Sequence, residues 1–143
     1  MSTPGLADLE VGSALPTLTV RFTRQTLVRY AGASTDFNPI HYSEHYAAEV
    51  DLPGVIAHGL LTMGTALRVV TDWVGDGTRV RSYFVRFTKP VVVPDTEDGV
   101  EITFSAKVEA ITGSLVTVAI QAVYADVSVL GAARAEVELG EQG

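Results

Sequence analysis

The sequence predicts an α+β fold in which an antiparallel sheet wraps around one long buried helix. Two patterns carry this prediction. Residues 100–139 alternate apolar and polar side chains in three consecutive segments, whereas residues 60–74 repeat apolar and small side chains mainly at three- and four-residue spacing. The first pattern is typical of strands with one solvent-exposed face, and the second is typical of a helix. Strands that follow a helical block, rather than alternating with helices, favour an antiparallel α+β architecture.

A strand is expected first, at residues 17–22, because apolar side chains occupy every second position there. Thr23 and Ser43 belong to the residue types that cap helices, and each precedes a segment with helical spacing. We therefore expect one helix after Thr23 and a short helix that runs from Ser43 towards Val50.

The third expected helix is the longest. It begins near Leu60 and ends at Gly75, where the run Gly-Asp-Gly breaks helical structure. The segment carries two charged residues, and its small residues Gly64 and Ala66 would allow a close approach of neighbouring elements. A helix with so few charges is expected to be covered on most sides.

The remaining strands follow the long helix. Residues 80–93 are rich in β-branched and aromatic side chains, but two prolines indicate a strand that is broken or ends at a sheet edge. From residue 100 to residue 110 every even position is apolar, and residues 112–114 form a turn before residues 116–124 continue the two-residue period. The last segment places on one face Val127, Val129, Ala133, Ala135, Val137 and Leu139. Three consecutive strands with short connections predict an antiparallel meander.

Composition limits the class of protein. The chain has 143 residues, a formal net charge of -7 and no cysteine. This length fits one domain, residues 1–143, that can fold without disulfides. A pI of about 4.8 without a basic cluster argues against a nucleic-acid partner. No segment has the features of a signal peptide or a membrane-spanning helix, so a soluble, cytoplasmic protein without a membrane partner is expected.

The densest group of polar and turn-forming residues lies at positions 34–41. Pro39 biases Asn38 away from the α region, so Asp36 and His41 are expected on a shaped loop rather than on one helix. A carboxylate and an imidazole that converge can share one water and act as a general acid–base pair near neutral pH. The alternative is that Asp36 and Asn38 only close Asx-turns and that His41 only leads into the next helix.

A second candidate element is the start of the long helix, at His58 and Gly59. The first N–H groups of a helix have no intrahelical acceptor and lie at the positive end of its dipole. Because Gly59 has no side chain, a substrate carbonyl could come close enough to be polarised, and an enolate oxygen would be stabilised more strongly. The alternative is that Gly59 only allows tight packing of the helix against the sheet.

D-F-N-P-I-H at residues 36–41, followed by A-H-G at residues 57–59, resembles the signature of the MaoC-like (R)-specific enoyl-thioester hydratases and 3-hydroxyacyl-thioester dehydratases, which have the hotdog fold. The resemblance extends over most of the chain. Four further segments are most similar to the catalytic, β-type subunits of the mycobacterial 3-hydroxyacyl carrier-protein dehydratases: residues 30–32, 59–64, 71–76 and 85–88.

The resemblance implies a hydro-lyase that acts on 2-enoyl or (R)-3-hydroxyacyl thioesters of coenzyme A or acyl carrier protein. Asp36 and His41 would activate water or, in reverse, remove the hydroxyl group. Asn38 would support their loop, the Gly59 N–H would face the thioester carbonyl, and His58 would contribute to substrate binding. This chemistry requires no cofactor and no metal. The resemblance also implies a homodimer, or a heterodimer with a related hotdog subunit.

Two positions depart from the family pattern. Thr35 stands where the family commonly has glycine, and Ser43 stands where it commonly has an acidic residue. Because threonine is β-branched, Thr35 is not expected to adopt the positive φ that glycine would.

Three alternatives to the hydratase remain open. His41, Glu44 and His45 fit the H-x-x-E-H zinc motif of inverzincin peptidases, although Pro39 and the short helix argue against it. A hotdog thioesterase would direct water at the carbonyl carbon instead. A non-catalytic partner subunit would only shape an acyl tunnel.

Overall fold

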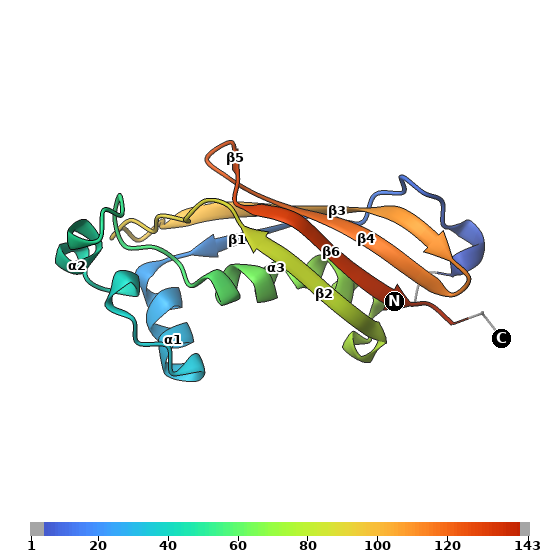
Figure 1. Ribbon diagram of the computed structural model, residues 1–143, viewed down its shortest axis with the longest axis horizontal. Helices are drawn as coiled ribbons and strands as arrows, with labels where there is room; N and C mark the ends of the chain where they lie inside the picture. Colours follow the sequence, from blue (N-terminus) through green and yellow to red (C-terminus); the bar gives the residue numbers. More distant parts are fainter. Residues whose placement is uncertain (1–4, 141–143) are drawn as a thin grey trace.

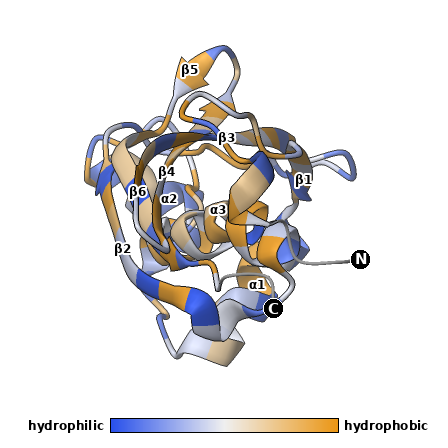
Figure 2. Cartoon of the chain, turned by 90° about the vertical axis from the view of Figure 1, so that its right-hand side faces the viewer, coloured by the Kyte–Doolittle hydropathy of each residue, from blue (hydrophilic) through white to orange (hydrophobic). Residues whose placement is uncertain are grey.

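Six strands form one antiparallel sheet that curves around helix α3 (Gly59–Val74) in the part of the chain that the structure describes (Figures 1 and 2). The structure is a computed structural model that describes residues 5–140. The predicted α+β architecture is confirmed. The other elements are η1 (Leu6–Asp8), β1 (Leu18–Phe22), α1 (Arg24–Ser34), η2 (Pro39–His41), α2 (Glu44–Glu49), η3 (Gly77–Arg79), β2 (Val80–Phe87), β3 (Val100–Thr112), β4 (Leu115–Tyr124), β5 (Val127–Ser128) and β6 (Leu130–Glu138).

The strand order in the sheet is β1-β3-β4-β6-β2, and the short β5 pairs with β4. β3 pairs with β4 and β4 pairs with β6, and only the two-residue β5 lies between β4 and β6 in the sequence, so the predicted meander is confirmed. Within residues 5–140, β2 pairs with β6 alone and therefore lies at an edge, as the prolines that follow it predict.

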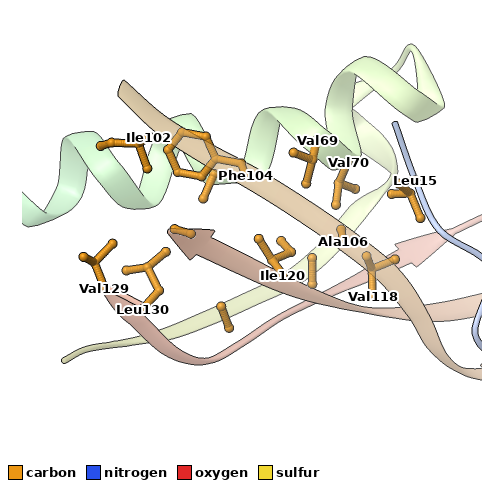
Figure 3. Packing of buried hydrophobic residues seen from close by; sticks show 14 of the residues in the cluster. Leu15, Val69, Val70, Ile102, Phe104, Ala106, Val118, Ile120, Val129 and Leu130 are labelled. Atoms are coloured by element: carbon orange, nitrogen blue, oxygen red, sulfur yellow. The ribbon is translucent and has the colours of Figure 1, made fainter. Parts of the chain in front are cut away.

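The inner face of the sheet packs against α3 and forms the core, and Figure 3 shows Val69 and Val70 extending from α3 towards the strands. Burial of this apolar surface is the main favourable term for the fold. The side chains of β3, β4, β6 and α3 that are almost fully buried include Ile102, Phe104, Val108, Val116, Val118, Ile120, Ala135, Val137, Ala66, Val69, Val70 and Val74. The alternation read from the sequence is therefore confirmed for most of the core.

The prediction of inward-facing residues is wrong at Ala110 and Val127, both of which are exposed. A register shift between Val108 and Ala110 marks a β-bulge in β3, and a bulge moves the following residues to the opposite faces. Val127 belongs to β5, which leaves the main sheet as a short hairpin with β4 (Figure 1).

The three predicted helices are present. Thr23 caps α1 in a reciprocal capping box with Thr26, and the Ser43 side chain accepts a hydrogen bond from the Tyr46 N–H at the start of α2. Helix α3 exposes a narrow stripe of residues four positions apart, so it is covered on most sides but not all. Gly64 lies on that stripe with open space beside it, which contradicts its expected role in close packing. No helix within residues 5–140 is long and apolar enough to cross a membrane.

The expectation for Thr35 is wrong. Thr35 is the C-terminal cap of α1 and adopts the left-handed conformation, with φ of 61° and ψ of 16°. A non-glycine residue there costs roughly 1–2 kcal/mol. The turn at the end of α1 is nevertheless formed, because the residues that follow it are held by hydrogen bonds of their own.

Two glycines with positive φ allow the cost of a steric clash to be separated from the cost of the left-handed backbone conformation. Gly99 has a φ of 54°, and an added Cβ atom would lie 2.0 Å from the Phe22 carbonyl oxygen, whereas Gly113 has a φ of 61° and no atom within 4 Å of that position. We expect Gly113→Ala to lower the free energy of unfolding by about 1 kcal/mol. Gly99→Ala should lower the free energy of unfolding by roughly 1–3 kcal/mol more than Gly113→Ala does. Denaturant titration of both variants measures the difference, and equal losses would contradict the tight contact between β1 and the start of β3.

Candidate functional site

The loop between α1 and α2 is built from consecutive side-chain turns. The Asp36 carboxylate accepts a hydrogen bond from the Asn38 N–H at 3.2 Å, and the Asn38 side chain accepts one from the Ile40 N–H at 3.2 Å. Pro39 then begins the single turn of η2, at the end of which His41 lies. The expected Asx-turns are therefore present, and they fix the direction in which the loop carries Asp36 and His41.

Asp36 and His41 converge. The His41 ring is buried, and its Nδ1 lies 2.7 Å from the Ile56 carbonyl oxygen. A carbonyl oxygen can only accept, so Nδ1 carries the hydrogen and the Nε2 of the neutral ring bears the free lone pair. That Nε2 lies 3.8 Å from Oδ2 of Asp36, whose side chain is half exposed. This separation is too long for a direct hydrogen bond, but it allows one water to contact both groups.

His58 contacts both members of this pair. Its side chain is 1% exposed, and its Nε2 donates a hydrogen bond to the Asp36 carbonyl oxygen at 3.2 Å. The His58 ring stacks on the His41 ring at a centroid distance of 3.8 Å and meets the Tyr30 ring edge-on at 4.7 Å. Burial, and then the neighbouring His41, lower the pKa of His58 below its ordinary value of 6.5. His58 is therefore a neutral donor at neutral pH, and it does not line the cavity described below.

Gly59 begins α3 immediately after His58. The N–H groups of Leu61 and Thr62 donate to the His58 carbonyl, whereas the Gly59 N–H has no protein acceptor within residues 5–140. A Cβ atom at Gly59 would lie 3.1 Å from the Phe87 ring, which comes from the end of β2. Gly59 thus allows the Phe87 ring to pack closely against the start of α3. Its N–H also remains available as a donor at the positive end of the helix.

A cavity of about 490 Å³ joins these groups. Asp36, His41 and Gly59 all line it, and Thr62, Thr88 and Lys89 add polar atoms. The rest of the wall is apolar and consists of Ile40, Ile56, Ala57, Leu60, Phe87, Pro90, Val91, Val129 and Leu130. The arrangement can hold an elongated apolar group with a polar reacting end.

Most of this wall carries no functional signal in the sequence. Phe87 falls in a segment that resembles the family as a block, and Val129 and Leu130 are predicted only as strand residues. No local signal identifies them as cavity residues, because β2, β6 and α3 meet there only in the folded chain.

Asp36, His41 and His58 place one potential metal-ligand atom each within 4.8 Å of one another. Imidazole lone pairs lie in the plane of the ring, however, and the two rings are stacked face to face. In addition, one nitrogen of each ring already donates to a carbonyl. The two rings therefore do not direct lone pairs at one point, and the present arrangement does not fit a metal ion.

The residues of the H-x-x-E-H motif do not form a zinc site either. His41 is buried in η2, whereas His45 is 85% exposed on α2 and lies 3.1 Å from Glu49. Glu44 forms an ion pair with Arg24. The motif thus spans two elements, and its side chains do not face a common centre.

Known proteins resemble this chain over much of its length. The family model described as "MaoC like domain" matches residues 9–125. The "3-oxo-4,17-pregnadiene-20-carboxyl-CoA hydratase beta subunit" of Mycobacterium tuberculosis is 31% identical over 108 residues, which cover 76% of this chain and 80% of that protein. The "3-hydroxyacyl-thioester dehydratase X" of the same organism is 38% identical over 81 residues, which cover 57% of this chain and 28% of that protein.

Among solved structures, a "MaoC-like dehydratase" superimposes with a TM-score of 0.92 at 35% identity, covering 97% of this chain and 43% of that one. The chain spans only 3% to 28% of the length of several curated relatives, which include fatty acid synthase β subunits. The match over residues 9–125, together with the hydratase β subunit of comparable length, shows that this chain belongs to the family of MaoC-like dehydratase domains and has the hotdog fold.

Proposed function

We propose that this chain catalyses the reversible hydration of a 2-enoyl thioester to an (R)-3-hydroxyacyl thioester, carried by coenzyme A or acyl carrier protein. The observation that carries the proposal is the cavity that joins the Asp36–His41 pair and the free Gly59 N–H along an apolar wall. Relatives named as a CoA hydratase subunit and a hydroxyacyl-thioester dehydratase support the same reaction class.

The mechanism follows from where charge must develop. One water occupies the gap between Oδ2 of Asp36 and Nε2 of His41 and attacks Cβ of the enoyl group. The His41 lone pair accepts one proton of the water, while the Asp36 carboxylate accepts the other O–H as a hydrogen bond and orients the attack. As the C–O bond forms, the π electrons move onto the thioester oxygen. The proton on His41 is then returned to Cα, and dehydration follows the same steps in reverse.

The enolate oxygen needs a donor that is already in place. The Gly59 N–H supplies one at the positive end of α3, and the apolar wall around it keeps the local dielectric low. A preorganised donor of this kind is typically worth about 10²–10³ in rate. The proposed mechanism thus places the base at Cβ and the donor at the carbonyl, both within the same cavity.

We also infer that a second hotdog domain covers the edge of β2. Phe84 and Phe87 of this strand are each 55% exposed, and in the described chain one side of β2 has no strand partner. Open edges and exposed aromatic side chains of this kind are typical of interaction surfaces. A homodimer is the simpler form, and the relative named as a β subunit supports a heterodimer as the alternative.

The catalytic pair is tested by Asp36→Asn and His41→Ala. We expect each variant to remain folded and to lose about 10²–10⁴-fold in turnover, because each removes one of the two groups that activate water. The assay follows the loss of the conjugated enoyl absorbance with crotonyl-CoA and longer trans-2-enoyl-CoA substrates. Asp72→Asn, on the exposed stripe of α3, is the matched control and should keep full activity.

Three outcomes of this assay would refute the proposal. Thiol release from saturated acyl-CoA without hydration would identify a thioesterase. Full activity in both Asp36→Asn and His41→Ala would place catalysis elsewhere. The chain would be a non-catalytic partner if the wild-type protein alone hydrates no enoyl thioester and if the double variant Asp36→Asn, His41→Ala still activates a related subunit.

Gly59→Ala tests whether the substrate approaches the start of α3. The Phe87 ring is the exposed end of a flexible side chain and can move by a few tenths of an ångström, so we expect the variant to fold normally. We expect kcat/KM to fall at least about tenfold, because the new methyl group hinders approach of the thioester to the N–H. The same loss should persist when Phe87→Ala is added. Recovery to the Phe87→Ala level would show that Gly59 serves only the packing of Phe87.

The partner is tested by the mass of the purified chain in solution. We expect twice the 15.2 kDa of one chain. A single-chain mass that doubles only after a related hotdog subunit is added would establish the heterodimer, and a monomer with full activity would contradict a covered β2 edge.

A further inference from the structure

We propose that His58 is a positioning residue, a neutral imidazole that holds the Asp36 backbone and the His41 ring at the separation needed to share one water. This role rests on the hydration proposed above. In it His58 acts through Asp36 and His41 and does not contact the substrate. His58 is absent from the cavity wall, so any effect it has on the reaction must pass through the residues that it touches.

One ring joins the parts of the site that the chain brings from different elements. The Nε2–H of His58 donates to the Asp36 carbonyl, one face of the ring stacks on His41, and Tyr30 of α1 contacts it edge-on. The same residue is the N-terminal cap of α3, directly before Gly59, so the ring is tied through the backbone to the Gly59 N–H. A displacement of the loop would have to break the hydrogen bond or the stack.

Burial and the neighbouring His41 favour the neutral ring, although the Asp36 carbonyl and carboxylate favour the charged form. The groups that face it are the Asp36 backbone and carboxylate on the loop, the His41 ring, the Tyr30 ring and the positive end of α3. A cation there would oppose the helix dipole and the positive charge that forms on His41 when it takes a proton from water. Burial of the ring also favours its neutral form over the cation.

The remaining nitrogen of His58 argues against a purely structural role. Its Nδ1 is buried without a hydrogen-bond partner among residues 5–140. A hydrocarbon ring of similar shape would stack on His41 without leaving a desolvated acceptor, but it could not donate to the Asp36 carbonyl. The donor and the stack together are what an imidazole supplies at this position.

Two variants separate these contributions. His58→Phe keeps the ring and loses the donor, whereas His58→Gln keeps an N–H near the position of Nε2 and loses the stack. We expect each to lower kcat about 10–100-fold with KM nearly unchanged, because a misplaced catalytic pair slows the chemical step more than it weakens binding. His45→Gln carries the same substitution at a histidine that is 85% exposed, and it should keep wild-type kcat.

A measurement on the wild-type protein tests the inference even where a variant fails to fold. Nitrogen-15 NMR of the imidazoles, at the pH of the assay, should show His58 neutral with its proton on Nε2. A charged His58, or a proton on Nδ1, would overturn the inference.

The kinetic outcomes separate the inference from the proposed function. Wild-type kcat in both His58 variants, or a loss confined to KM, would overturn the role of His58 while the hydration stands. A wild-type chain that hydrates no enoyl thioester, alone or with a second hotdog subunit, would overturn the hydration itself and the role of His58 with it.

Discussion

Burial of α3 inside the curved sheet fixes where this helix begins, and the candidate site is built around that point. The inner faces of β3, β4 and β6 cover α3 along its length, so the helix cannot slide without exposing apolar side chains. Its first residue, Gly59, is thereby held at the cavity with a free N–H, and His58 just before it is held against the loop that carries Asp36. The apolar packing of α3 against the sheet thus positions the polar groups of the candidate site.

The site combines a half-exposed acceptor with two buried donors. The Asp36 side chain is half exposed and accepts a hydrogen bond from the Asn38 N–H, whereas the His41 and His58 rings are buried and each donates to a backbone carbonyl. These carbonyls determine which nitrogen of each ring bears the proton. The free lone pair of His41 consequently faces Asp36. In the proposed mechanism this leaves one base and one orienting acceptor for the water.

The edge of β2 links the site to assembly. Phe87 at the end of this strand covers Gly59 and lines the cavity, and both Phe87 and Phe84 of the same strand are exposed. A domain that pairs with this edge would lie beside the cavity. In the proposed dimer, therefore, the partner would limit solvent access to the bound acyl group as well as cover exposed aromatic surface.

Local patterns in the sequence were enough to predict the strands, the caps at Thr23 and Ser43, the end of α3 and the loop bent by Pro39, because each depends on neighbouring residues. The motif at residues 36–41 also identified Asp36 and His41 as a pair. The bulge after Val108, the stacking of His58 on His41 and the cover of Phe87 over Gly59 were decided by tertiary structure. Each of these depends on contacts between segments that are apart in the chain, and no periodicity or spacing records such contacts. The positive φ of Thr35 was missed for a different reason, because the β-branched side chain argues against the left-handed conformation that the residue adopts.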